Sequence, residues 1–241
     1  TASDADPHQG PDGGPHALTG APPPASFRLV HPILDPAARP VVGHRGNRAR
    51  APENTLEAFA RAVRLGVEAF AQAVALGVDA LELDVHRSAD GVAVVHHDAT
   101  VERTTSGRGP VAAMTVAELR ALDAGARFTA DGGRTHPYRE CGITIPTLDE
   151  VLAAFPSTPL LIELKTAAAA PAVLADIARH GAASRCVVDS FDAGALDPFR
   201  GGPIAVGAAQ SDVALLLAAA MTRYPVRAVR YRALCIPQRF R

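Results

Sequence analysis

The sequence predicts an α/β protein built on a parallel β-sheet. Two observations lead to this prediction. From residue 40 onward, short apolar runs alternate with stretches of helical periodicity, and two of the runs carry acidic residues at the same end. Strands that alternate with helices indicate a parallel sheet, which is either doubly wound or closed into a barrel. With 241 residues, 48% of them apolar, the chain can bury a sizeable core.

The alternation of expected strands and helices begins after an N-terminal tail. Residues 1–38 are rich in Pro, Gly, His and Asp, so we expect them to be disordered, and residues 39–241 to form the α/β domain. The chain starts at Thr1 without Met or a signal peptide, which leaves the localisation open between cytoplasmic and exported. Strands are expected at residues 41–42, 80–85, 92–96, 159–164, 185–189, 204–207 and 228–231. Helices are expected from residue 55 and at residues 148–155, 171–180 and 213–223.

Residues 57–78 contain a tandem duplication inside the first helix. The segment EAFARAVRLGV is followed directly by EAFAQAVALGV, and nine of the eleven positions are identical. Eleven residues make about three helical turns, so the duplication keeps the apolar face nearly in register. Either the helix is longer by about 16 Å with Gly66 inside it, or Gly66 ends the first copy and the second forms a separate segment.

The charge balance argues against some classes of partner. The chain has 24 basic and 25 acidic residues, which gives no support to a nucleic-acid or anionic-membrane partner.

The apolar run at residues 213–220 is too short to span a bilayer. The three cysteines fit neither a zinc pattern nor a disulfide framework; they are Cys141, Cys186 and Cys235.

The expected strand at residues 80–85 carries charge where a buried strand should not. Glu82 and Asp84 are two residues apart, so their carboxylates point to the same face. In a barrel, the other face packs on helices, and the carboxylates then face the interior or its rim. The alternative is a solvated edge strand with alternating polarity.

The expected strand at residues 159–164 repeats this pattern, with Glu163 and Lys165 on one face. One interpretation is a buried structural ion pair. The other is a functional site, because an unpaired buried charge costs several kcal/mol, on the order of 5. Three carboxylates that converge at one strand rim need a cation, and oxygen ligands favour Ca²⁺ or Mg²⁺ over zinc.

Histidine and arginine complete this set of candidate residues. His44 and Arg45 follow the first strand, and arginine suits bidentate recognition of phosphate. His97 follows the strand expected at residues 92–96. Two histidines on neighbouring strand ends can act as general base and general acid on opposite sides of a phosphorus centre.

Together these segments resemble the glycerophosphodiester phosphodiesterase family. The matching text is GHRGNRARAPENTLEAFARAV, DALELDVHRSADGVAVVHHDATVERTTSGRG, LDAGARF, IPTLDEVL and LLIELK. The motifs cover most of residues 41–165, and as a group they are highly specific. After Lys165 the last clear similarity is the segment VDSF at residues 188–191.

The resemblance implies a TIM-type β/α barrel like that of phosphatidylinositol phospholipase C. It implies an enzyme that hydrolyses glycerophosphodiesters, small-molecule substrates, to sn-glycerol 3-phosphate and an alcohol. The implied roles are a Ca²⁺ or Mg²⁺ ion on Glu82, Asp84 and Glu163, acid–base catalysis by His44 and His97, and phosphate binding by Arg45 and Lys165. Glu53 and Asn54, from the PENT segment, would support the site. Residues 100–145, which break the alternation, would form a lid-like insertion.

The chain also departs from the family pattern. Relatives lack the duplication, and they continue with further strands where this chain ends. Because a β/α barrel needs about 250 residues, we expect an incomplete barrel that lacks one or two C-terminal strands and leaves the first strand with an open edge. That edge allows a homo-oligomer. Two alternatives to an active enzyme follow: an inert barrel that at most binds metal or phosphate, and a sphingomyelinase D-like phospholipase.

Overall fold

The computed structural model describes residues 32–35, 40–69, 78–223, 225 and 229–234. Most of the predicted tail therefore lies outside the described residues, although Pro32–Leu34 (η2) forms a short 3-10 helix. Most of the second repeat copy, residues 70–77, also lies outside them. Within the described part of the chain, no helix is both long and apolar enough to cross a lipid bilayer.

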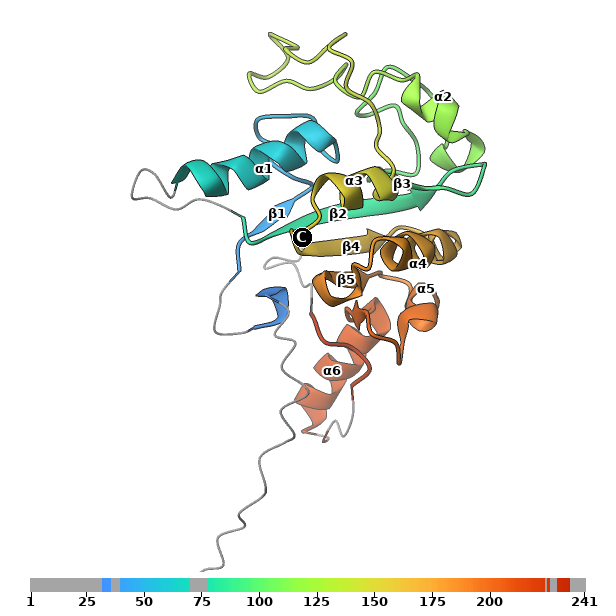
Figure 1. Ribbon diagram of the computed structural model, residues 1–241. Helices are drawn as coiled ribbons and strands as arrows, with labels where there is room; N and C mark the ends of the chain where they lie inside the picture. The colour runs from blue at the N-terminus through green and yellow to red at the C-terminus, as the bar shows by residue number, and fades with distance from the viewer. Residues whose placement is uncertain (1–31, 36–39, 70–77, 224, 226–228, 235–241) are drawn as a thin grey trace, which may run out of the picture.

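A parallel sheet forms the centre of the molecule (Figure 1). Five parallel strands pair in a single order, β1-β2-β4-β5-β6. Their bounds are β1 (Val42–His44), β2 (Ala80–Arg87), β4 (Leu160–Leu164), β5 (Cys186–Asp189) and β6 (Ala205–Val206). The sixth strand, β3 (Ala93–Val95), runs antiparallel to β2. Among the described residues β1 pairs only with β2, so the architecture is that of an incomplete α/β barrel.

The strand expected at residues 228–231 is not found in its described part. Residues 229–231 are irregular, and the chain joins the sheet later, through a single bridge between Gly207 and Ala233. The amide of Arg232 donates to the carbonyl of Val206 at 2.7 Å, and the amide of Ala208 donates to the carbonyl of Ala233 at 2.9 Å. These bonds fix the register, so the prediction placed the sheet contact a few residues too early.

Helices cover the apolar face of the sheet. They are α1 (Leu56–Ala69), α3 (Leu148–Ala154), α4 (Ala170–Arg179) and α5 (Ala193–Leu196), with short 3-10 helices η4 (Ala167–Ala169), η5 (Ala183–Arg185) and η6 (Asp197–Phe199). Helix α6 (Gln210–Thr222) follows β6 and buries Ala219 alone among its residues, so it contributes little to this layer. Helix α3 begins where Thr147 and Glu150 form a capping box. Alternate residues of β2 contribute to the main core, among them Leu81, Leu83 and Val85, which are fully buried. The opposite face of β2 is thereby left for its polar residues.

Helix α1 shows the conformation of Gly66 in the duplicated segment. It continues through Gly66 and ends at Ala69, so Gly66 does not end the helix at the first copy. Glycine inside a helix costs about 1 kcal/mol relative to alanine, which a long packed helix can tolerate.

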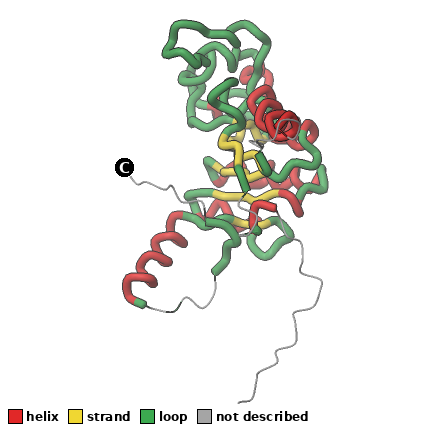
Figure 2. The backbone as a smooth tube through the Cα atoms, turned by 90° about the vertical axis from the view of Figure 1, so that its left-hand side faces the viewer, coloured by secondary structure: helices red, strands yellow, loops and turns green. Residues whose placement is uncertain are grey.

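Residues 100–145 form a separate loop-rich lobe. They contain only the short helices η3 (Val111–Ala113) and α2 (Val116–Arg120), and they have a small core of their own around Val101, Leu119 and Ile145. Figure 2 shows this lobe at one end of the molecule and α6 at the other. The hydroxyl of Tyr138 donates to the carbonyl of Arg50 at 2.8 Å, which attaches the lobe to the loop between β1 and α1.

Candidate active site

The loop that follows β1 has a strained backbone at Arg45. Its φ angle is 57°, in the left-handed region that side chains other than glycine rarely adopt. The Arg45 amide donates to Oε2 of Glu82 at 2.9 Å and also to the Glu82 carbonyl at 3.0 Å. Such strain persists where the surrounding structure holds it, and it is concentrated at functional sites.

The backbone at residue 46 explains why a glycine directly follows His44 and Arg45. Its φ angle is +74°, and a Cβ at this position would lie 2.6 Å from the backbone carbon of Ala58 in α1. No side chain fits there, because backbone cannot give way as a flexible side chain can. The close contact sets the distance between the end of β1 and the start of α1.

Three carboxylates converge on β2 and β4. Glu82, Asp84 and Glu163 each offer an oxygen, and these oxygens all lie within 4.8 Å of one another. Asp84 and Glu163 are direct partners in the parallel register. Asp84 is fully buried and Glu82 is 7% exposed, and β2 lies inside the sheet, which excludes the solvated edge strand.

The proximity of these carboxylates changes their proton affinity. Burial, followed by the negative charges of Asp84 and Glu163, raises the pKa of Glu82 to about 8. A proton or a cation therefore stabilises the cluster near neutral pH.

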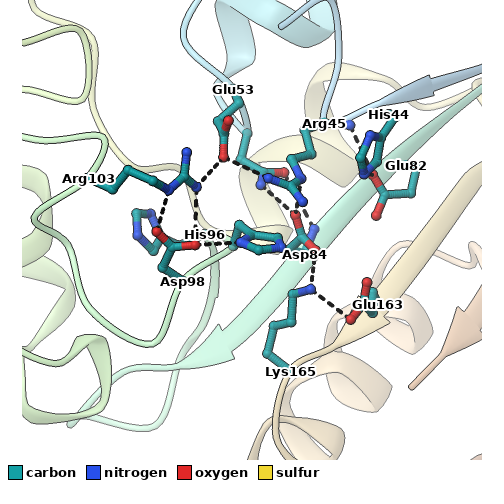
Figure 3. Close-up of polar contacts among 12 residues, drawn as sticks. His44, Arg45, Glu53, Glu82, Asp84, His96, Asp98, Arg103, Glu163 and Lys165 are labelled. Carbon is teal, nitrogen blue, oxygen red and sulfur yellow. Dashed lines mark hydrogen bonds and ion pairs between the residues drawn. The ribbon is translucent and has the colours of Figure 1, made fainter. Parts of the chain in front are cut away.

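Two basic side chains contact the buried Asp84 (Figure 3). The ammonium of Lys165 lies 2.7 Å from Oδ1 of Asp84 and 2.7 Å from Oε1 of Glu163, and Nε of Arg45 lies 3.3 Å from Oδ2 of Asp84. Burial opposes the charge on Lys165, but the bonds to the two carboxylates outweigh it and raise its pKa. The ion pair considered for Glu163 and Lys165 is thus present, within a larger charged network.

The PENT segment contributes two further contacts. Asn54, with a φ angle of 56°, donates from Nδ2 to Oδ2 of Asp84 at 2.8 Å. Oε1 of Glu53 accepts from Nη1 of Arg45 at 3.0 Å and from Nη2 of Arg103 at 2.6 Å. Burial would raise the pKa of Glu53, but the two arginines outweigh burial and lower it.

The two histidines have different surroundings. His44 is 53% exposed, and its Nε2 lies 3.8 Å from Oε2 of Glu82. Partial burial, followed by the charges of Arg45 and Arg48, lowers the pKa of His44, so its imidazole is neutral at neutral pH. His97 lies two residues beyond β3, and its Nδ1 is 2.5 Å from Oδ1 of Asp98.

Sequence analysis did not identify two members of this network, Asp98 and Arg103. Nε of Arg103 donates to Oδ2 of Asp98 at 2.5 Å, and Nη2 of the same guanidinium reaches Glu53, fifty positions away in the sequence. These bonds, together with that of His97, hold the pKa of Asp98 well below its usual range. The segment RTT at residues 103–105 was the sequence signal that could have identified Arg103. The spacing of residues along the chain could not identify the partner of Arg103.

The donor set fits a divalent cation. The network holds five carboxylates and three basic side chains, so two negative charges remain when all are ionised and the histidines are neutral. The three converging ligands all offer oxygen, which hard cations prefer. Glu82, Asp84 and Glu163 are therefore the residues that could hold such an ion.

Comparisons with known proteins agree with this geometry. Residues 67–200 match the pattern of the Glycerophosphoryl diester phosphodiesterase family. The chain is 38% identical over 157 residues to an uncharacterized protein of Mycobacterium tuberculosis, an alignment that covers 64% of this chain and 48% of the relative. The chain thus spans about half the length of that curated relative.

Solved structures show the same fold. The glycerophosphoryl diester phosphodiesterase domain of an uncharacterized M. tuberculosis protein superposes with a TM-score of 0.66 at 32% identity, covering 77% of this chain and 65% of the other. A phosphodiesterase of Oleispira antarctica, solved in complex with the product sn-glycerol-3-phosphate, superposes with a TM-score of 0.56 at 30% identity. That superposition covers 70% of this chain and 64% of the other.

Proposed function

Because the chain belongs to the glycerophosphoryl diester phosphodiesterase family, we propose that it is a phosphoric diester hydrolase. Its reaction would convert a glycerophosphodiester and water into sn-glycerol 3-phosphate and an alcohol. The observation that carries the proposal is the convergence of Glu82, Asp84 and Glu163 within 4.8 Å beside Arg45, Lys165 and His44. His97 joins the same network through Asp98, Arg103 and Glu53. The product complex of the Oleispira antarctica relative supports the choice of substrate.

In the proposed mechanism, Glu82, Asp84 and Glu163 would hold a divalent cation, Ca²⁺ or Mg²⁺. When bound, the cation would neutralise and polarise the phosphate. Arg45 and Lys165 bind the phosphate oxygens, a role for which a guanidinium and an ammonium are suited. Both already lie at the cluster through their contacts with Asp84.

His44 acts as the general base and His97 as the general acid. The lowered pKa of His44 leaves its imidazole free to accept a proton from the attacking water, whose oxygen forms the new bond to phosphorus. The Asp98 carboxylate at Nδ1 of His97 holds the ring in place, and His97 donates a proton to the leaving alcohol oxygen as the bond to phosphorus breaks. Glu53 and Asn54 act as positioning residues, because they fix Arg45 and Asp84.

The test is release of sn-glycerol 3-phosphate from glycerophosphocholine and from glycerophosphoinositol, measured with a coupled enzyme. We expect release from at least one of the two diesters with Ca²⁺ or Mg²⁺ and its loss with a chelator. If a folded, monodisperse sample releases none from either diester with either metal, the inert barrel is the better interpretation. Glu163→Gln, which removes one ligand charge, should lower the release at subsaturating metal.

A further inference from the structure

A hollow lies next to the site, between the β1–α1 loop and the lobe of residues 100–145. Its volume is about 220 Å³, and its wall includes Arg48, Glu53, Arg103, Arg127 and Phe128. We call it the arginine pocket. Tyr138, which bonds to the carbonyl of Arg50, holds the lobe against the loop beside it, so both walls are anchored.

The arginine pocket shares two residues with the catalytic network. Glu53 contacts Arg45 on one side and Arg103 on the other, at 3.0 and 2.6 Å. Arg103 in turn holds Asp98, the partner of His97. The pocket therefore lies on the side of the site where the proposed acid meets the leaving alcohol.

Two guanidinium groups in this pocket have no anionic partner among the residues that the structure describes. Arg103 is neutralised by Glu53 and Asp98, whereas neither Arg48 nor Arg127 forms an ion pair with any carboxylate of the described residues. Nε of Arg127 donates to the carbonyl of Thr105, at 3.3 Å.

A cationic alcohol such as choline fits this surface poorly. Recognition of a quaternary ammonium uses several aromatic faces, and Phe128 is the one aromatic ring that lines the pocket among the described residues. Glu53, the one carboxylate on the described wall, already contacts two arginines. Three arginines against one glutamate leave an excess of positive charge, which repels a cation and attracts an anion.

We infer that the arginine pocket binds the alcohol part of the substrate and selects alcohols that carry an additional anionic group, such as a phosphate. The inference rests on the proposed function, and it names Arg48 and Arg127 as specificity-determining residues. A second phosphate on the alcohol would meet the guanidinium groups of Arg48 and Arg127, which form no ion pair within the described part of the chain. Each of them can donate two parallel hydrogen bonds.

A matched pair of substrates tests this directly. Glycerophosphoinositol and glycerophosphoinositol 4-phosphate differ only in one phosphate on the alcohol. We expect kcat/KM to be at least 10-fold higher for the phosphorylated substrate, with most of the difference in KM. Arg127→Gln and Arg48→Gln should each lower this ratio, and the double variant should bring it to about 1. Arg134→Gln, which changes an exposed arginine of the same lobe outside the pocket wall, should leave the ratio unchanged.

Binding of the free alcohols separates failure of this inference from failure of the proposed function. Inositol 4-phosphate and inositol are titrated into the metal-loaded protein by calorimetry, without any need for turnover. Tighter binding of the phosphate, lost in the double variant, supports the pocket even if no substrate is hydrolysed. Equal binding of the two alcohols, or a ratio of kcat/KM near 1 in the wild type, overturns the inference while hydrolysis itself can still proceed.

Discussion

At the residue scale, Asp84 on β2 contacts side chains from the β1–α1 loop and from the residue that follows β4. It is fully buried, and it contacts Lys165, Arg45 and Asn54 at distances between 2.7 and 3.3 Å. A buried carboxylate of this kind is tolerated only when charges and hydrogen bonds surround it. The positions of Asn54 and Arg45 therefore serve the buried charge of Asp84 as well as substrate binding.

The first prediction concerns the two histidines. His44→Ala and His97→Ala should each lower kcat at least about 100-fold, because general acid–base catalysis contributes on that scale. His180→Ala is the matched control, since His180 contacts Asp149 on α3, away from the carboxylate cluster. Turnover of the control should stay within about 2-fold of the wild type. Full activity in either catalytic-site variant would remove that histidine from the mechanism.

The second prediction concerns pH and metal binding. Because its pKa is raised to about 8, Glu82 keeps a proton in the folded state at neutral pH. In the unfolded chain the same carboxyl has its ordinary pKa and is ionised. Its contribution to stability is present below the ordinary pKa of a glutamate and is lost as the pH rises through about 8. A divalent cation can replace that proton, so the rise in Tm caused by Mg²⁺ or Ca²⁺ should be larger at pH 8.5 than at pH 6.

Thermal unfolding with and without metal checks this pH dependence. Glu82→Gln, which cannot ionise, should show a smaller metal effect that no longer grows with pH. Equal metal effects at the two pH values in the wild type would mean that Glu82 does not exchange a proton for the ion.

At the element scale, the sequence predicts most strands and helices because their patterns are local. The alternation of apolar and charged residues predicted β2 and β4, and helical periodicity predicted α3. The late sheet contact at Ala233 could not be predicted, because its register is set by hydrogen bonds with Val206 and Ala208 rather than by its own residues. For the same reason the bond between Glu53 and Arg103 was not foreseen.

The third prediction concerns the contact between the end of β1 and α1. Gly46→Ala should lower the free energy of unfolding by at least about 2 kcal/mol, since it adds a steric clash to an unfavourable φ angle. Gly181→Ala is the control: its φ angle is +58°, but a Cβ there meets nothing within 4 Å. Denaturant unfolding compares the two. An equal loss of stability in both variants would contradict the close approach of Gly46 to Ala58.

The fourth prediction concerns the duplication at residues 57–78. The family pattern begins at residue 67, within the repeat, which agrees with one extra copy of the segment. Deleting residues 68–78 places Val67 directly before Asp79, where Val78 now contacts the position of Gly43. We expect a folded protein whose free energy of unfolding changes by no more than about 1 kcal/mol, because loop length has a weak effect on stability.

Deletion of residues 57–67 is the matched variant. It yields nearly the same sequence as the other deletion, and differs only by loss of Arg61 and Arg64. Since Arg61 contacts Glu57 and the ring of Tyr138, any difference between the two deletions in circular dichroism or unfolding reports on arginine. Unfolding of both would show that the two copies are needed together.

At the scale of the whole molecule, the proposed site joins two parts of the chain. The sheet supplies the carboxylates on β2 and β4, and the lobe of residues 100–145 supplies Arg103. The sequence motifs could predict the first group, because the strand period places Glu82 and Asp84 on one face. They could not predict the arginine pocket, because its walls come from segments far apart in the sequence.

The most direct test of the central claim is a phosphorus NMR spectrum of a glycerophosphodiester incubated with the protein and Mg²⁺ or Ca²⁺. The account predicts that the diester signal is replaced by that of sn-glycerol 3-phosphate, and that a chelator stops the conversion. Both histidine variants should leave the diester intact over the same period. An unchanged diester signal with folded, metal-loaded wild-type protein, or conversion that continues in the chelator, would contradict a metal-dependent phosphodiesterase at Glu82, Asp84 and Glu163.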